Sequence, residues 1–235
     1  MKIIWILYLM LSSLFFILTF SCVKSNDDIT TPPIETSTIT DIDGNVYQTV
    51  KIGAQWWMAE NLKTRKFNDG SSILLITDDS MWCHISSPGF CYFNNDSITY
   101  KNEYGALYNK YAVLTGKLAP IGWHVPTNAE YQTLIDYLGG ISVAGGKMKE
   151  IGTIHWSSPN AGADNSSGFT GLPGGIREKW VGTFEAMNRE FGYWWTGSDA
   201  GHVILYHYNS MVALSEMNYN GQYLKSGYSV RCVRN

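Results

Sequence analysis

With 235 residues and a formal net charge of −3, the chain is long enough for one ordinary domain and has no basic field to attract nucleic acid. Only 16% of its residues are charged, whereas 14% are aromatic and 23 are glycines. This composition argues against a helical bundle and is typical of an extracellular domain with an aromatic core and many glycine turns.

The first 22 residues determine the predicted compartment. Lys2 is followed by a largely apolar run over residues 3–20, and Cys22 stands shortly after it. The run approaches the length of a membrane-spanning helix, but no cationic cluster follows it and the cysteine stands at the expected processing point. The sequence up to this cysteine resembles a bacterial lipobox. Residues 1–21 are therefore predicted to be a lipoprotein signal peptide, and Cys22 is predicted to carry the lipid that anchors the protein to a membrane.

Residues 23–37 are polar and acidic, contain Pro32 and Pro33, and show no hydrophobic period. They predict a flexible, solvated tether, so that Cys22 and the tether together span residues 22–37. The acidic residues also fit an export signal, although a plain linker is the more common meaning of such a run. The folded domain is predicted to occupy residues 38–235.

Three cysteines remain in the predicted domain, and one disulfide is expected in an oxidising compartment. Cys83 and Cys91 enclose a short loop that contains serine, proline and glycine, and we predict that they are partners. A bond from Cys232 to one of them is the alternative, because pairing does not follow from sequence alone.

The predicted domain begins with β structure. Residues 38–41 and 46–52 predict the two strands of a hairpin, because Asp43 and Gly44 between them form a type I′ turn signal. Residues 55–62 then predict a buried strand followed by a turn.

Two helices are predicted in the middle of the chain. Apolar side chains recur with helical spacing over residues 104–114. A second helix follows Thr127, which forms a capping box with Glu130, and it ends at Gly139. Because these helices lie between β regions and do not alternate with strands, the predicted fold class is α+β.

The last third of the chain predicts the central sheet. Residues 228–234 form a β-like segment at the end of the chain, and a terminus frays unless another strand pairs with it. This strand is expected to have one apolar face. Residues 203–208 are apolar or aromatic on both faces, which predicts a strand covered on both sides. Trp194 and Trp195 point to opposite sides of an extended segment, so at most one is expected in the core.

Seven phrases occur in a fixed order along the chain: DIDGNVY at 41–47, WMAENL at 57–62, YGALYN at 104–109, GWHVPT at 122–127, GFTGLPGGIR at 168–177, GYWW at 192–195 and SVRCV at 229–233. Together they resemble the Fibrobacter succinogenes major paralogous domain family, which is common among surface lipoproteins of Bacteroidetes-type bacteria. The resemblance covers residues 38–235. It implies a C-type-lectin-like fold, related to the formylglycine-generating-enzyme module, with two short helices, a small twisted mainly antiparallel sheet and long irregular loops. It also implies an outer-membrane location facing the cell surface.

The chain departs from this family at two positions. Family members often carry cysteine where Ala119 stands, and the resemblance pairs that cysteine with the position of Cys232. Here the partner is missing, so Cys232 is expected to be buried and free. Lys110 stands where the family often has tryptophan, which places a charge on the predicted first helix.

The sequence offers little support for catalysis. An oxidase of the formylglycine-generating type needs a reactive cysteine pair near the C-terminus, and only Cys232 lies there. A serine hydrolase needs a Gly-x-Ser-x-Gly elbow, which is absent from the sequence. We therefore predict no enzyme activity, no cofactor and no metal site. The one alternative is a structural calcium ion at residues 158–165, where oxygen ligands are concentrated, although asparagine and aspartate there are more simply turn formers.

A binding function is predicted from aromatic and amide side chains in the last third of the chain. Aromatic rings stack on sugars while amides form hydrogen bonds, and tyrosine-rich surfaces also recognise proteins. We predict a cell-surface lipoprotein with a non-catalytic domain that binds a glycan or a protein. The alternatives are a formylglycine-generating-enzyme-like oxidoreductase and a structural envelope protein without a small ligand. The predicted ligand-binding residues are Trp195, Tyr206, Tyr208, Asn209, Asn218, Tyr219 and Tyr223.

Overall fold

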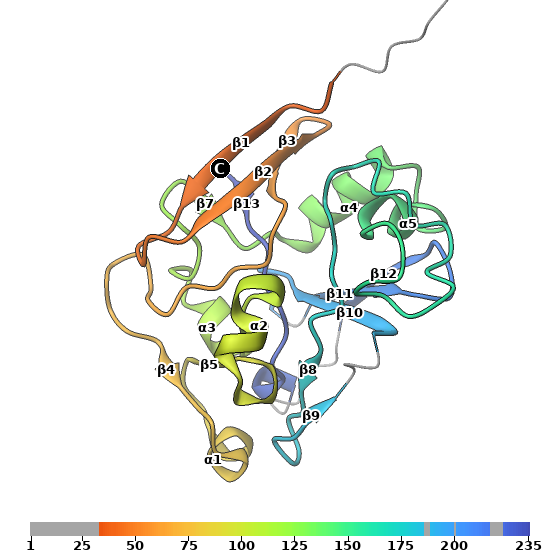
Figure 1. Cartoon of the computed structure of the whole chain (residues 1–235). Coiled ribbons are helices and arrows are strands. Elements are labelled where there is room, and N and C mark those ends of the chain that lie inside the picture. Colours follow the sequence, from red (N-terminus) through yellow and green to blue (C-terminus); the bar gives the residue numbers. More distant parts are fainter. Residues whose placement is uncertain (1–32, 186–188, 200, 217–222) are drawn as a thin grey trace, which may run out of the picture. The chain divides into compact units, whose positions relative to one another are not determined.

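The computed structural model describes residues 33–185, 189–199, 201–216 and 223–235 (Figure 1). The predicted signal peptide and Cys22 lie outside the described residues, and so do the predicted ligand residues Asn218 and Tyr219. Among the helices that are described, none has both the length and the apolar character that crossing a membrane requires.

The largest sheet has five antiparallel strands, and the end of the chain lies inside it. Its strand order is β1-β2-β3-β13-β7, where the last two residues before Asn235 form β13. Val233 pairs with Trp57 on one side and with His124 on the other. The prediction that the chain ends in a central strand is therefore confirmed. The bounds are β1 (Thr36–Thr40), β2 (Val46–Ile52), β3 (Gln55–Met58), β7 (Trp123–His124) and β13 (Val233–Arg234).

The predicted N-terminal hairpin is confirmed, but its turn differs from the prediction. The last register pair joins Thr40 to Val46, and only Gly44 in the connection has a positive φ, of 83°. A type I′ turn needs positive φ at two successive residues. The Asp41 carboxylate organises the loop instead, because it accepts the backbone N–H groups of Asp43 and Asn45 at 2.9 Å each.

A second sheet contains β10 (Phe191–Trp195), β11 (Gly201–Tyr206) and β12 (Val212–Glu216), all antiparallel. Trp194 on one face packs in the core with Phe169, at a centroid distance of 6.1 Å. Trp195 on the other face is also buried, against Tyr228 at 4.4 Å. The expectation that at most one of the two tryptophans faces the core is therefore wrong, because the C-terminal segment covers the second side of β10.

The predicted second helix is confirmed as α4 (Asn128–Tyr137) with its capping box. The Thr127 hydroxyl accepts the N–H of Glu130 at 3.2 Å, and the Glu130 carboxylate accepts the N–H of Thr127 at 2.8 Å. Gly139 follows with φ of 101°, which ends the helix at low steric cost. A short helix that was not predicted, α5 (Ala144–Met148), comes next.

The helix predicted over residues 104–114 is wrong over its first half. The structure has α2 (Ser97–Tyr104), then the extended β6 (Leu107–Tyr108), then α3 (Lys110–Leu114). Gly105 breaks the pattern with φ of 77°, and a β-carbon there would lie 2.7 Å from the Leu62 carbonyl oxygen. Asn109 then starts α3 by accepting the N–H of Ala112. The helical spacing misleads because the residues of β6 are buried on both faces.

The remaining elements are short, and long irregular segments such as residues 149–175 connect them. They are β4 (Leu74–Leu75), α1 (Asp79–His84), β5 (Gly89–Cys91), η1 (Phe93–Asn95), β8 (Ile176–Arg177), β9 (Phe184–Glu185) and η2 (Tyr223–Lys225). The fold is therefore α+β with short helices and several sheets, in agreement with the predicted class.

The C-terminal segment joins several of these sheets. Isolated bridges connect Gly227 to Arg177, Tyr228 to Tyr108 and Ser229 to Trp194 before the chain enters β13. Residues 226–233 are all buried, so the predicted single apolar face is wrong. Arg231, for example, is only 1% exposed.

Candidate functional site

One face of the second sheet carries aromatic side chains that reach the surface. The strand register places Phe191 beside Tyr206, with ring centroids 5.8 Å apart. Tyr193 lies 6.2 Å from Phe191 along β10, and Tyr208 lies 5.4 Å from Tyr206. Tyr208 is 52% exposed and the other three rings are half-buried. We call these four residues the aromatic face.

The aromatic face continues inward as a stack of buried rings. Tyr193 stacks on Tyr228 at 5.3 Å with an interplanar angle of 23°, and Tyr228 contacts Trp195. Trp195 is 1% exposed, and its indole N–H donates to the Tyr108 carbonyl at 2.7 Å. Trp195, which was predicted from the sequence as a ligand residue, is therefore a buried core side chain in this structure. Its ring supports the aromatic face from below.

The other predicted ligand residues divide between surface and structural roles. Tyr206 and Tyr208 are brought together in the aromatic face. Tyr223 is half-buried in η2, and the Lys179 ammonium lies 4.3 Å from its ring centroid. Asn209 forms a turn, because its side-chain oxygen accepts the N–H of Met211 at 2.8 Å.

Two members of the aromatic face, Phe191 and Tyr193, were missed from the sequence. Their signal was present, since both alternate with Trp194 and lie on the same side of β10 as Trp195. Burial, together with nearby tyrosines and acidic side chains, raises the pKa of the Tyr193 hydroxyl, and burial also raises that of Tyr206. These hydroxyls stay protonated at neutral pH, so the face offers neutral rings and hydrogen-bonding groups.

The aromatic face and the second sheet lie within a segment that matches a protein-family model. The model of the Fibrobacter succinogenes major domain matches residues 50–234. The chain belongs to this family. No curated protein and no solved structure matches the chain.

A buried lysine, Lys149, contacts the loop at residues 158–165, where the sequence offered calcium as an alternative. Lys149 is fully buried, and its ammonium donates to the carbonyl oxygens of Ala161 at 3.0 Å, Tyr206 at 2.8 Å and Asn209 at 2.9 Å. Burial lowers the pKa of Lys149 to about 8. The Lys149 ammonium thus binds one carbonyl oxygen of residues 158–165, one at the end of β11 and one in the turn that follows it.

Side chains of the same loop make turn contacts. The Asn160 amide donates to the carbonyls of Glu150 at 2.8 Å and Gly152 at 2.6 Å, and Asn165 bonds to Thr170. Across the described ranges, no group of three or more histidine, cysteine or acidic side chains is placed to hold a metal ion.

The cysteines of the described domain are free thiols. The predicted Cys83–Cys91 bond is absent: Cys91 is buried in a cluster with Ile76 and Trp82, whereas Cys83 is half-buried at the end of α1. Cys232 is free and 0% exposed, as the family resemblance implied. Burial raises the pKa of Cys91 to about 12 and that of Cys232 further. Such thiols are poor nucleophiles and poor metal ligands.

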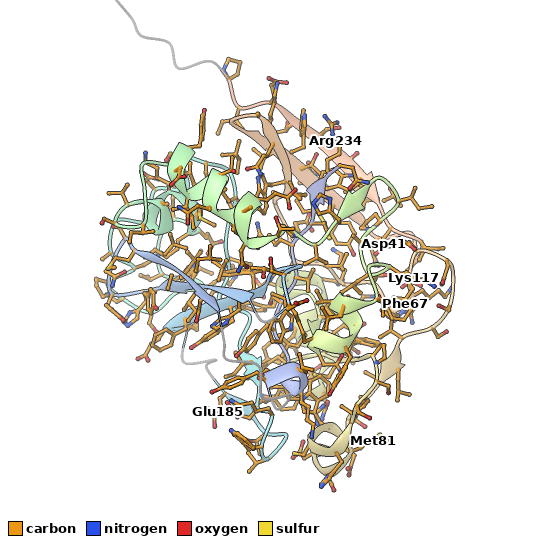
Figure 2. The ribbon with its side chains drawn as sticks, turned by 180° about the vertical axis from the view of Figure 1, so that it is seen from behind. Asp41, Phe67, Met81, Lys117, Glu185 and Arg234 are labelled. Atoms are coloured by element: carbon orange, nitrogen blue, oxygen red, sulfur yellow. The ribbon has the colours of Figure 1, made fainter. Side chains whose placement is uncertain are left out.

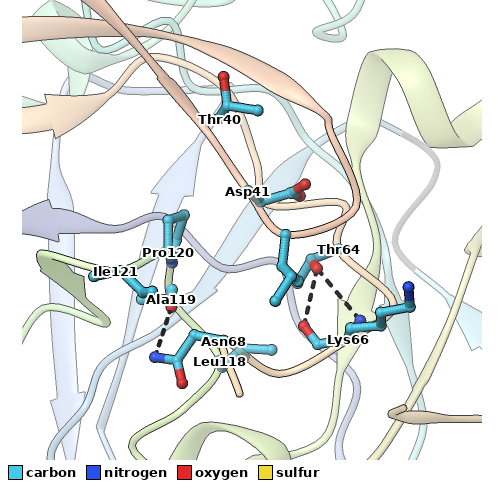
Figure 3. A pocket seen from close by; sticks show the side chains of 10 residues that line it. Thr40, Asp41, Thr64, Lys66, Asn68, Leu118, Ala119, Pro120 and Ile121 are labelled. Carbon is cyan, nitrogen blue, oxygen red and sulfur yellow. Dashed lines mark hydrogen bonds between the residues drawn. The ribbon is translucent and has the colours of Figure 1, made fainter. Parts of the chain in front are cut away.

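The domain also has a hollow of about 190 Å³ beside the turn of the N-terminal hairpin (Figure 3). Its polar groups are largely committed: the Thr64 hydroxyl bonds to Lys66 and the Asn68 amide donates to the Ala119 carbonyl at 3.2 Å. Figure 2 shows Asp41, Phe67 and Lys117 on this side of the molecule, with Glu185 at the opposite side. The hollow is lined by Thr40, Asp41, Ile42, Thr64, Lys66, Asn68, Leu118, Ala119, Pro120 and Ile121.

Proposed function

We propose that this member of the family is a cell-envelope lipoprotein whose domain binds an extracellular ligand, a glycan or a protein, without catalysis. The observation that supports this proposal is the aromatic face formed by Phe191, Tyr193, Tyr206 and Tyr208. These rings contact one another at the surface, so packing of the core does not account for them. Tyrosine is favoured at binding surfaces because its ring is apolar and its hydroxyl forms hydrogen bonds.

The geometry of the rings narrows the kind of ligand. Phe191 stands at 78° to Tyr206 and at 82° to Tyr208, and Tyr206 is tilted by 54° from Tyr208. The rings therefore make a corrugated surface rather than a flat one. Such a surface suits a short or branched glycan, or a protein loop, better than a long flat polysaccharide chain.

The proposal includes the finer fold and the location. Short helices, small sheets, long loops and a C-terminal strand in the main sheet support a C-type-lectin-like domain related to the formylglycine-generating-enzyme module. The lipobox-like sequence supports a lipid on Cys22 and an outer-membrane position facing the cell surface. Palmitate labelling of the full chain in its host should disappear in the Cys22→Ala variant, and labelling that persists would contradict the anchor.

Ligand binding is tested with the full chain in detergent, screened on a glycan array and in a pull-down with cell-surface proteins. We expect the double variant Tyr206→Ala, Tyr208→Ala to bind at least about tenfold more weakly, since each contacting ring contributes ~1 kcal/mol. The matched control is Tyr137→Ala, which removes a 66% exposed tyrosine from α4. No ligand in either screen, or equal binding by both variants, would contradict the proposal.

A further inference from the structure

The first strand of the domain has an unpaired edge. Just before β1, the Glu35 carbonyl accepts the backbone N–H of Lys51, and just after β1, the backbone N–H of Asp41 donates to the Asn45 carbonyl. Because hydrogen-bonded positions alternate along an antiparallel strand, the odd-numbered positions of residues 35–41 bond to the neighbouring strand. In an antiparallel ladder the intervening residues point their N–H and C=O groups away from the partner strand. The backbone of Thr36, Thr38 and Thr40 therefore faces outward, and these groups have no backbone partner within the described part of the chain.

This edge lacks the features that normally prevent strand addition. Proteins protect edge strands with charges, prolines, bulges or covering loops. β1 contains no charged residue and no proline. Its pairing with β2 has no bulge over its five residues. The side chains of Thr36, Ser37, Thr38 and Thr40 are exposed and uncharged.

The outward series of residues is symmetric about its centre. Within β1 it reads Thr36, Thr38, Thr40, and an exposed isoleucine flanks the strand on each side: Ile34, 49% exposed, before it, and Ile42, 46% exposed, in the hairpin turn. A second copy of the strand, placed antiparallel with the two Thr38 residues opposite each other, would pair Thr36 with Thr40 and bring Ile34 near Ile42 at each end of the contact. Each outward threonine would then exchange both of its backbone hydrogen bonds with its partner.

We propose that β1 is the contact surface of a homodimer, in which two copies pair their first strands antiparallel about a twofold axis at Thr38. The contact is isologous, since each copy presents the same residues to the other. It would join the two five-stranded sheets into one continuous sheet. β1 lies at the outer edge of its sheet in Figure 1, where this addition takes place.

The charges near the edge do not oppose this pairing. The register brings Glu35 opposite Asp41 of the second copy, but the Asp41 carboxylate is turned inward, where it accepts the Tyr47 hydroxyl at 2.6 Å, and Asp41 is only 7% exposed. Glu35 forms an ion pair with Lys51 at 2.7 Å. Ile34 of the second copy would lie against Ile42, beside the hollow of Figure 3.

The dimer should be concentration-dependent. A pair of five-residue strands buries less than the roughly 800 Å² per partner of a standard stable interface. Copies held on the same surface would meet at a much higher effective concentration than copies in dilute solution. Dimerisation is thus expected at high protein density and not at low density.

The test uses the full chain in detergent, with polypeptide mass measured by light scattering over a range of concentrations. Thr38→Lys places like charges at the twofold axis, and Thr38→Pro removes an outward donor while leaving the bonds to β2 intact. The matched control is Gln48→Lys, because Gln48 is the register partner of Thr38 and puts the same charge one strand away from the axis. We expect the mass to double with concentration for the wild type and for Gln48→Lys, and to stay monomeric for both Thr38 variants.

Cross-linking gives a second measurement that does not depend on a variant losing stability. Hydrogen-bonded antiparallel partners have Cα atoms about 5.5 Å apart, within reach of a disulfide. Mild oxidation should therefore link Thr38→Cys into a covalent dimer and leave Gln48→Cys monomeric. A wild type that stays monomeric, or a Thr38→Cys variant that is not linked, would overturn the proposal.

Discussion

Replacing Arg231 with methionine is expected to lower the free energy of unfolding by about 3–5 kcal/mol. The guanidinium is buried, and it donates to the side-chain oxygen of Asn61 at 3.0 Å, to the Thr170 carbonyl at 2.7 Å and to the Phe169 carbonyl. It also lies 4.2 Å from the Phe169 ring centroid. These contacts tie the C-terminal segment to the loop that precedes β8.

The magnitude follows from what methionine leaves behind. Methionine keeps much of the apolar volume of arginine, so the cavity contribution is small. The Phe169 and Thr170 carbonyls, however, lose a charged donor, and each such hydrogen bond contributes roughly 1.5–3 kcal/mol. Removal of the buried charge offsets part of this loss, because desolvating a cation is itself unfavourable.

Urea unfolding followed by tryptophan fluorescence measures the effect, and the melting temperature should fall by about 6–20 °C. The matched control is Arg234→Met, three residues later. Arg234 is exposed and lies 5.0 Å from the Trp56 ring centroid, so its loss should cost about 0.5 kcal/mol. Equal destabilisation by the two variants would refute the assignment of Arg231 as a buried anchor.

Three further predictions concern buried groups. Burial and a neighbouring ammonium lower the pKa of His202 to about 4. As the pH falls, the unfolded state therefore binds this proton before the folded state does. The free energy of unfolding should decrease as the pH falls from about 6.5 to about 4. We expect this decrease to be roughly 3 kcal/mol larger in the wild type than in His202→Gln. In Lys149→Met, three carbonyls lose their donor, so urea unfolding should show a loss of about 2–4 kcal/mol that added calcium does not restore; rescue by calcium would contradict the internal-cation interpretation. A thiol reagent should label Cys83 in the native protein, and Cys91 and Cys232 only as fast as it unfolds; equal rates for all three thiols would show that the burial is wrong.

Elements with strong local signals were predicted well. The capping box of Thr127 and Glu130 and the glycine at 139 define both ends of α4, because helix ends are stabilised by residues close in sequence. The β1–β2 hairpin follows from two alternating segments around Gly44. In each of these cases the interactions that form the element lie within a few residues of it.

Predictions that needed distant partners were less successful. The segment around Leu107 looks helical by spacing, but it pairs with β5 and follows a glycine pressed against the Leu62 carbonyl. Trp195 looked like a ligand residue, yet Tyr228 covers it from a segment more than thirty positions later in the sequence. When a segment far away in the sequence buries a side chain, the local hydrophobic pattern around that side chain does not indicate the burial.

The sequence by itself determined the family, the α+β class, the ends of α4 and the placement of the final residues in the main sheet, because these depend on motifs and patterns within single segments. Only the tertiary structure decided which aromatic rings meet on the second sheet, which cations bind backbone carbonyls inside the domain, and that the three thiols do not pair. Those outcomes depend on burial between segments far apart in the chain. Contacts of that kind form only when the whole domain has folded.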